Sequence, residues 1–221
     1  MDYLKKHINC YREDTLEFVT MRINKFVLGH KSNTAIIAVA GPGACGKSTF
    51  SRTLHKELKN CKLINLDDYR KSRVSRAELG LMGSHPDAVK LGQITGNLKD
   101  LKHGSNITKP VYNTVTGTDD QTEEVTSSPI ILLDGEAAAF AELQSYIDFL
   151  IFIDVNPAIQ LKVRLNRDVN QHGHSQAKAL NVHLTSDLQD FPAFGAASRK
   201  FADIILQFQP DFRHTVKMIA D

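Results

Sequence analysis

The chain has 221 residues, of which 42% are hydrophobic and 24% charged, with a formal net charge of +2 at pH 7. This composition is that of an ordinary globular domain with one full core, and the balanced charge implies neither a nucleic-acid partner nor a membrane partner. No apolar run approaches the length of a membrane span, the N-terminus lacks a signal-peptide core, and the three cysteines lack metal-binding spacing, so we expect a cytoplasmic protein.

Residues 1–30 are predicted to form a helical N-terminal extension. Leu16, Val19 and Ile23 recur at helical spacing, and Gly29 is a natural place for the helix to end. We expect this helix to pack on the outside of the core, and its sequence indicates no chemistry. The remainder, residues 31–221, is expected to form one domain.

A phosphate-binding loop follows the first predicted strand. Residues 34–40 are an unbroken apolar run, typical of a buried parallel strand, and residues 48–58 place apolar side chains four apart, as on one face of a helix. Between them, residues 41–48 read GPGACGKS, which matches the P-loop pattern G-x-x-x-x-G-K-[ST]. A strand, a glycine loop and a helix in this order predict a nucleoside triphosphate site. The residues expected to hold the nucleotide are Gly41, Gly43, Ala44, Cys45, Gly46, Lys47, Ser48 and Thr49.

Three residues of this loop carry more specific expectations. Lys47 is expected to reach the β- and γ-phosphates, and Ser48 to offer its hydroxyl to Mg²⁺. Cys45 has two interpretations. It is either a reactive thiol, because a helix N-terminus and a lysine favour the thiolate, or a small residue that fits the turn.

Two later strands end in acidic residues. Residues 61–66 lead into Asp67 and Asp68, and the apolar run from residue 129 ends at Asp134, which has the place of a Walker B acid that holds Mg²⁺. Residues 146–154 and 202–206 predict two more strands, and residues 158–170 a helix. The alternation predicts an α/β fold of the P-loop NTPase kind, with a doubly wound, mostly parallel sheet and helices on both faces.

Residues 68–128 are predicted to be an insertion beside the second strand. Its first part, residues 71–85, is basic, and Lys71, Arg73 and Arg76 form either a solvated loop or a rim that attracts an anionic substrate. Residues 87–101 predict a helix, residues 107–115 an extended segment, and residues 117–128 a polar turn and an edge strand.

The order of these segments resembles the phosphoribulokinase/uridine kinase family, most closely the uridine-cytidine kinases, over roughly residues 35–206. A GTPase is excluded because the Asn-Lys-x-Asp guanine motif is missing. The resemblance rests on seven short motifs in one order. They are the P-loop, Asp67-Asp68-Tyr69-Arg70, His85-Pro86-Asp87-Ala88, Pro110-Val111-Tyr112, Leu133-Asp134-Gly135, Arg164 to Val169 with Gly173, and Arg199 to Ile205.

The resemblance implies an ATP-dependent kinase that uses Mg²⁺ and phosphorylates a hydroxyl of a small metabolite, with a nucleoside favoured. It implies Asp67 as the catalytic base, with Asp68 as the alternative because this chain is one residue short before Arg70. Arg164 and Arg167, in a lid at about residues 164–190, would neutralise the transferring phosphoryl group together with Lys47. On a plain reading, these arginines are a solvated helix face. The acceptor-binding residues implied are Asp68, Tyr69, His85 and Tyr112.

Several positions depart from the pattern of the family. An Asp that binds the ribose hydroxyls in nucleoside kinases is Ser84 here, and a base-binding histidine is Gly117. Asp134 replaces a common Glu, and His174 replaces a lid arginine. Two alternatives therefore stay open, namely another acceptor such as pantothenate, glycerate or a sugar phosphate, and a nucleotide-binding protein without transfer activity. A homo-oligomer is also left open.

Overall fold

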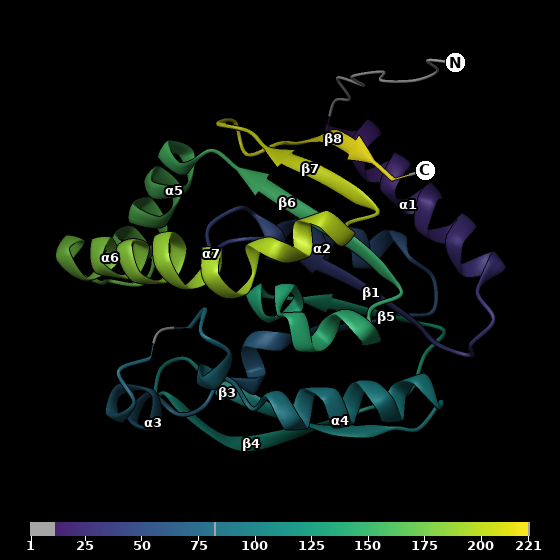
Figure 1. The fold of residues 1–221 in the computed structure, drawn as a ribbon, viewed down its shortest axis with the longest axis horizontal. Coiled ribbons are helices and arrows are strands. Elements are labelled where there is room, and N and C mark those ends of the chain that lie inside the picture. The colour runs from purple at the N-terminus through teal and green to yellow at the C-terminus, as the bar shows by residue number, and fades with distance from the viewer. Residues whose placement is uncertain (1–11, 82, 221) are drawn as a thin grey trace.

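The computed structural model describes residues 12–81 and 83–220. Its centre is a six-stranded sheet in the order β2-β5-β1-β6-β7-β8 (Figure 1). The first five strands are parallel, and β8 runs antiparallel to β7. The strands are β1 (Ala35–Ala40), β2 (Cys61–Asn65), β5 (Ile130–Asp134), β6 (Phe149–Val155), β7 (Ile204–Phe208) and β8 (His214–Ile219). The expected α/β fold with a mostly parallel sheet is confirmed.

Helices cover both faces of this sheet because its central strands are apolar on both sides. Every residue of β1 and β5 is buried. On one face, the core includes Ile23 and Leu54, and on the other it includes Leu98 and Phe191. Each such side chain contributes about 1.5–3 kcal/mol through burial. The first face carries α1 (Arg12–Gly29), α2 (Lys47–Glu57) and α5 (Pro157–Asn170), and the second carries α4 (Leu91–Lys102) and α7 (Phe191–Phe194).

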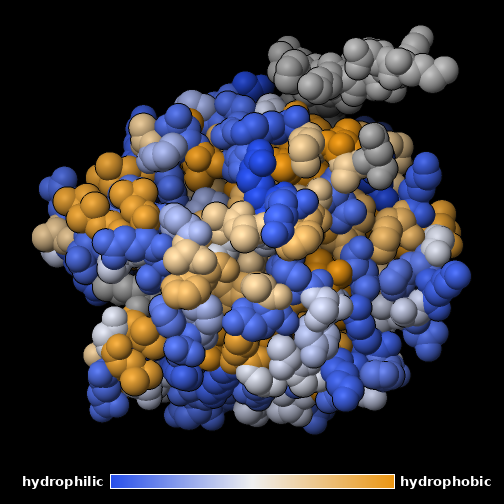
Figure 2. All heavy atoms as spheres, viewed as in Figure 1, coloured by the Kyte–Doolittle hydropathy of each residue, from blue (hydrophilic) through white to orange (hydrophobic). Residues whose placement is uncertain are grey.

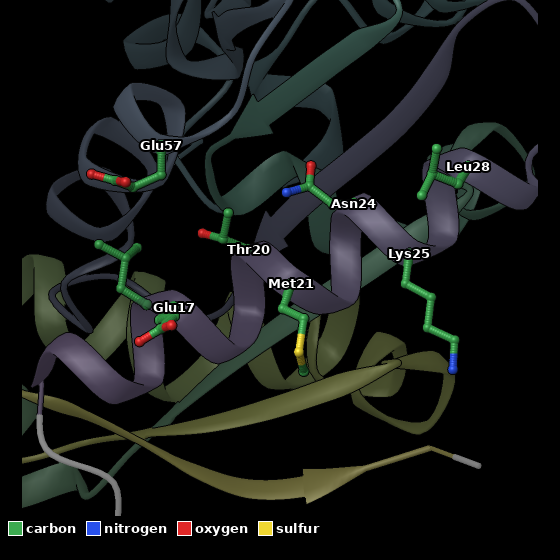
Figure 3. Close-up of a pocket in the computed structure, with 8 residues that line it drawn as sticks. Glu17, Thr20, Met21, Asn24, Lys25, Leu28 and Glu57 are labelled. Atoms are coloured by element: carbon green, nitrogen blue, oxygen red, sulfur yellow. The ribbon is translucent and has the colours of Figure 1, made fainter.

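Helix α1 is the described part of the predicted N-terminal extension, and residues 1–11 lie outside the described ranges. Val19 and Ile23 are fully buried in the same cluster as β1 and α2, so the helix completes one face of the core. Its outer side borders a groove of about 820 Å³ lined by Leu16, Thr20, Asn24 and Glu57, among others (Figure 3). This groove shares no residue with the P-loop.

The segment between β2 and β5 is more regular than the sequence indicates. The extended segment and the edge strand pair as a separate antiparallel hairpin, β3 (Ile107–Asn113) and β4 (Thr118–Val125). The basic stretch contains a short helix, α3 (Arg73–Glu78), rather than a continuous loop. The predicted helix starts later, at Leu91, because Val89 pairs with Arg70 in an isolated antiparallel bridge. Two 3₁₀ turns, η1 (Leu66–Tyr69) and η2 (Pro86–Ala88), flank this stretch.

Beyond α5, the chain forms α6 (Gln176–Val182) and a π-helical segment, η5 (His183–Asp190), which leads into α7. Apolar side chains gather on the surface at the left of Figure 2, on the side where Figure 1 shows α6. Leu180 of α6 and Leu184 of η5 are among the exposed apolar residues of the molecule. Three further 3₁₀ segments are η3 (Glu136–Ala139), η4 (Ala141–Tyr146) and η6 (Ala196–Phe201). None of the helices in the described ranges is both long and apolar enough to cross a membrane.

Candidate active site

The P-loop joins β1 to α2 in a conformation that depends on its glycines. Gly41 (φ 146°) and Gly46 (φ 80°) have positive φ angles, and Ala44 (φ 56°) is left-handed as well. A Cβ atom at Gly43 would lie 1.9 Å from Nη2 of Arg164, so a side chain at this position would displace the arginine from the loop. The loop leads directly into the N-terminus of α2 at Lys47, where backbone N–H groups and the helix dipole favour a phosphate.

The side chain of Lys47 folds back across the P-loop. Its Nζ donates to the carbonyl of Pro42 at 2.6 Å and lies 3.8 Å from Sγ of Cys45. Burial alone would lower the pKa of Lys47, but Cys45 and the carboxylates of Glu136 and Asp134 raise it overall. The ammonium group is therefore a fixed positive charge at the loop.

Cys45 is fully buried beneath the loop, and burial raises the pKa of its thiol despite the nearby Lys47. A buried neutral thiol is a poor nucleophile. The structure therefore favours the second interpretation of Cys45, a small residue that fits the turn.

The acid at the end of β5 lies beside the start of α2. Asp134 is buried and accepts a hydrogen bond from Oγ of Ser51 at 3.2 Å. Burial raises its pKa, while a hydrogen bond from the exposed Ser48 acts in the opposite direction. One hydroxyl and one carboxylate fit a Mg²⁺ ion, which takes few protein ligands and completes its shell with water and phosphate. Within the described ranges, no group of three or more His, Cys, Asp or Glu residues is placed to hold a metal.

The two adjacent acids after β2 have different surroundings. Asp67 accepts a hydrogen bond from Nη2 of Arg70 at 2.9 Å and lies close enough to Lys47 and Asp134 to raise the pKa of both. Asp68 instead accepts from Nζ of the buried Lys109 at 2.6 Å. Asp68 is thus fastened to the β3–β4 hairpin, and Asp67 is the acid on the P-loop side.

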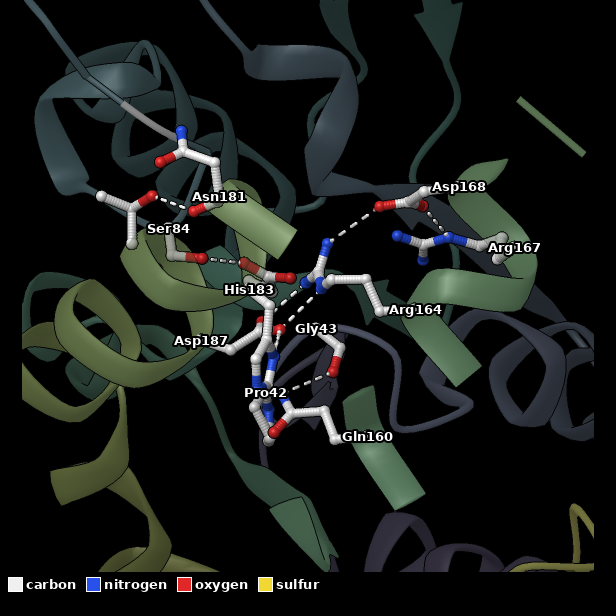
Figure 4. A network of polar contacts seen from close by, with 12 residues as sticks. Pro42, Gly43, Ser84, Gln160, Arg164, Arg167, Asp168, Asn181, His183 and Asp187 are labelled. Atoms are coloured by element: carbon white, nitrogen blue, oxygen red, sulfur yellow. Dashed lines mark hydrogen bonds and ion pairs between the residues drawn. The ribbon is translucent and has the colours of Figure 1, made fainter. Parts of the chain in front are cut away.

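Arg164 reaches the P-loop from α5, as Figure 4 shows. Its Nε and Nη2 donate to the carboxylate of Asp187 at 2.6 Å each, and this pair lies against Gly43. The amide of Gln160 also donates to the Gly43 carbonyl, at 2.9 Å. Arg167 is turned away and pairs with its neighbour Asp168 at 2.8 Å. The structure therefore brings one of the two predicted lid arginines to the loop.

Comparison with known proteins agrees with this geometry. The sequence model of the Phosphoribulokinase / Uridine kinase family matches residues 36–214. The chain belongs to this family.

Similar curated proteins carry two different names within this family. A phosphoribulokinase from Synechocystis sp. is 30% identical over 179 residues, which is 79% of this chain and 54% of the relative. A uridine kinase from Haemophilus influenzae is 31% identical over 182 residues, which is 77% of this chain and 85% of the relative. The chain thus spans about half the length of the phosphoribulokinases that it matches.

Solved structures agree on the fold. The D-glycerate 3-kinase from Cryptococcus neoformans superimposes with a TM-score of 0.70 at 11% identity, covering 93% of this chain and 98% of that one. At this level of identity, the likeness shows the fold alone.

The acceptor-side residues expected from the family are only partly together. The Tyr112 hydroxyl accepts from Nη2 of Arg76 at 2.7 Å. The His85 ring lies edge-on to Phe194 of α7, with ring centroids 4.6 Å apart. Tyr69 departs from the expectation of an acceptor-binding residue. It is packed in the core, its hydroxyl accepts from the Asn97 amide at 2.8 Å, and burial raises its pKa to about 12.

Three polar residues at the site were not identified from the sequence alone. Glu136 follows Asp134-Gly135 at the end of β5, and this position after a buried strand is a signal that could have found it. Its Oε2 accepts a hydrogen bond from the hydroxyl of Ser84. Gln160 and Asp187 carry no comparable local signal, because only the folding of α5 and η5 over the loop brings them to Gly43.

Proposed function

We propose that this protein is an ATP-dependent phosphotransferase that moves the γ-phosphate to a hydroxyl group of a small metabolite. The proposal is carried by the convergence of Lys47, Asp67, Asp134 and Arg164, from four separate segments, on one glycine loop. Membership of a kinase family supports the same reaction class.

Each of these groups has a chemical role in the proposed reaction. The loop and Lys47 bind the β- and γ-phosphates of ATP. Asp67, held by Arg70, accepts the proton of the acceptor hydroxyl as its oxygen bonds to the γ-phosphorus and the bond to ADP breaks. Ser48 and Asp134 would hold Mg²⁺, which supplies charge neutralisation at the phosphates when bound.

The lid side supplies the remaining positive charge and excludes water. Arg164 is buried beside Gly43, where it would stabilise charge on the transferring phosphoryl group after exchanging Asp187 for a phosphate oxygen. Closure of residues 164–190 over the loop limits the loss of ATP to water. Arg167 donates a hydrogen bond to Asp168 in this structure. It would join this role after a movement of the lid that breaks this contact.

A nucleoside is the favoured acceptor, and one observation supports an anionic acceptor as the second candidate. The guanidinium group of Arg76 contacts neutral groups, the hydroxyl and ring of Tyr112 and the carbonyl of Lys71. Arg73 likewise donates to the carbonyl of Thr114. In the described residues neither arginine has a carboxylate partner, so their charges are available to a phosphate or carboxylate of a substrate.

Incubation of the purified protein with Mg·ATP and single acceptors tests the proposal. Uridine, ribulose 5-phosphate and D-glycerate are supplied in turn, and the phosphorylated product is measured by mass spectrometry. We expect one of them to be phosphorylated, and Lys47→Ala to lower the rate by about 10²-fold or more. The exposed Lys56→Ala on the same helix is the matched control. ATP binding without a phosphorylated product from any acceptor would instead indicate a nucleotide-binding protein without transfer activity.

A further inference from the structure

We propose that Glu136 is a second acceptor-binding carboxylate, which accepts a hydrogen bond from a hydroxyl that is not phosphorylated. The acceptor is then a compound with at least two hydroxyl groups, one at Asp67 and one at Glu136. This inference rests on the proposed function and adds a specificity-determining residue to it.

The backbone places Glu136 beside Asp67. In the parallel pairing of β2 and β5, Asn65 is opposite Asp134, so Asp67 and Glu136 each lie two residues beyond the same pair. The two chains stay close past this point, because a Cβ atom at Gly135 would lie 3.0 Å from Cβ of Leu66. Two carboxylates from neighbouring strand ends therefore border the same side of the P-loop.

Cationic side chains lie around Glu136. Nη2 of Arg164 and Oε1 of Glu136 lie 1.9 and 2.8 Å from the same point, the place of a Cβ atom at Gly43. Lys47 and Arg70 are close enough to interact electrostatically with the same carboxylate. An ionised carboxylate accepts stronger hydrogen bonds from hydroxyl groups than a neutral group does.

One oxygen of this carboxylate is available to a ligand. Oε2 accepts from Ser84, whereas Oε1 accepts no hydrogen bond from any residue in 12–81 or 83–220. Oε1 lies over the phosphate loop, 2.8 Å from the place of a Cβ atom at Gly43. Glu136 is half-buried, and this carboxylate oxygen at the loop extends from the same strand pair as Asp67, so it is placed to accept a hydrogen bond from the acceptor.

The contact with Ser84 places this carboxylate beside a second segment. Ser84 is fully buried and precedes the His85-Pro86 step. Because the Ser84 hydroxyl donates to Glu136, the carboxylate reaches this segment from the end of β5.

Pairs of acceptors that differ by one hydroxyl test this inference. The pairs are uridine with 2′- and 3′-deoxyuridine, D-glycerate with 3-hydroxypropanoate, and ribulose 5-phosphate with its 3-deoxy analogue. We expect the wild-type protein to prefer the fully hydroxylated member of the accepted pair by about 10²-fold or more in kcat/KM. In Glu136→Ala, this preference should fall to about threefold, and the KM for the acceptor should rise by about tenfold or more. The KM for Mg·ATP should stay within about threefold of wild type, because uniform loss of acceptor binding leaves the donor site intact.

Two further variants separate a specific role from a structural one. Glu142→Ala, an exposed change six residues away, should leave the preference unchanged. The double variant Ser84→Asp/Glu136→Ala returns a carboxylate to the same neighbourhood and should restore at least tenfold preference for the hydroxylated acceptor.

Two results would overturn the inference alone, and a third would overturn the proposed function as well. An undiminished preference in Glu136→Ala, or an equal rise in the KM for Mg·ATP, would make Glu136 a structural counter-ion of Lys47 and Arg164. Failure of the wild-type protein to phosphorylate any acceptor would overturn the proposed function itself, and the inference with it.

Discussion

The carboxylates near the P-loop differ in which cation each of them contacts. The side chain of Asp67 is 46% exposed and contacts Arg70. Asp68 is instead paired with Lys109, and the Lys109 side chain is only 4% exposed. A base that takes a proton from a substrate needs an accessible oxygen. The two acids are adjacent in sequence, but their surroundings favour different roles.

Matched substitutions at these two positions test this difference. We expect Asp67→Asn to lower kcat by about 10²–10⁴-fold, because the variant loses the carboxylate that we propose as the general base. Asp68→Asn should keep kcat within about tenfold and lower the free energy of unfolding by about 1–3 kcal/mol, because Lys109 loses a charged partner. Steady-state kinetics and urea unfolding of both variants measure these effects. A larger loss of kcat in Asp68→Asn would exchange the two assignments.

At the scale of elements, Asp154 fastens the C-terminal part of the sheet. This residue of β6 accepts hydrogen bonds from Arg199 of η6, the shorter at 3.0 Å, and from Lys217 of β8 at 2.7 Å. Burial would raise the pKa of Asp154, but these two partners lower it overall. The ionised carboxylate therefore stabilises the folded chain by joining three segments.

The sign of this pKa shift predicts an acid dependence. The contribution of Asp154 is full above the unfolded pKa of about 3.9 and is lost as the pH falls through the lower, folded pKa. Asp154→Asn should therefore unfold at lower urea than wild type at pH 7 and pH 5, and the difference should shrink as the pH falls below about 3.9. The exposed Asp120→Asn serves as the control. A difference that stays constant down to pH 3 would show that packing, not charge, carries the effect.

The elements differ in how far the sequence predicts them. The apolar runs of β1 and β5 identify buried strands because both of their faces are covered. Strand β8 has no such run. Only His214 of this edge strand is buried, its other residues are half-buried or exposed, and only its pairing with β7 defines it. The β3–β4 hairpin is a similar case, because its register depends on contacts that single segments do not show.

For the whole molecule, the site is assembled from segments far apart in the chain. The P-loop motif could be read locally, because its glycines and lysine act through backbone geometry. Gln160 and Asp187 could not be predicted, because their positions depend on how α5 and η5 lie on Gly43, 117 residues before Gln160. The acceptor side was predicted least well, and Tyr69 shows why. A motif position does not reveal that its side chain points into the core.

A matched pair of glycine variants tests whether this assembly binds nucleotide. At a Mg·ATP concentration of 100 times Kd, binding should raise the free energy of unfolding of the wild type by about 2.7 kcal/mol. Gly43→Ala should lose most of this increase, because its Cβ would lie 1.9 Å from Arg164 and 2.6 Å from Asp187. Gly96→Ala, in α4 with nothing within 4 Å, should keep the increase and gain up to about 1 kcal/mol of intrinsic stability. Thermal unfolding with and without Mg·ATP gives both values, and an unchanged increase in Gly43→Ala would contradict the proposed site.

The ring of His214, at the start of β8, contacts the Cys45 carbonyl at 3.3 Å across a separation of 169 residues. During synthesis, the P-loop therefore cannot form its contact with His214 until residue 214 has left the ribosome. Contacts of such long range are costly to form early in folding, since the intervening chain must first be closed into a loop. The contact between His214 and the P-loop would thus form late, after all the parallel strands of the sheet have been translated.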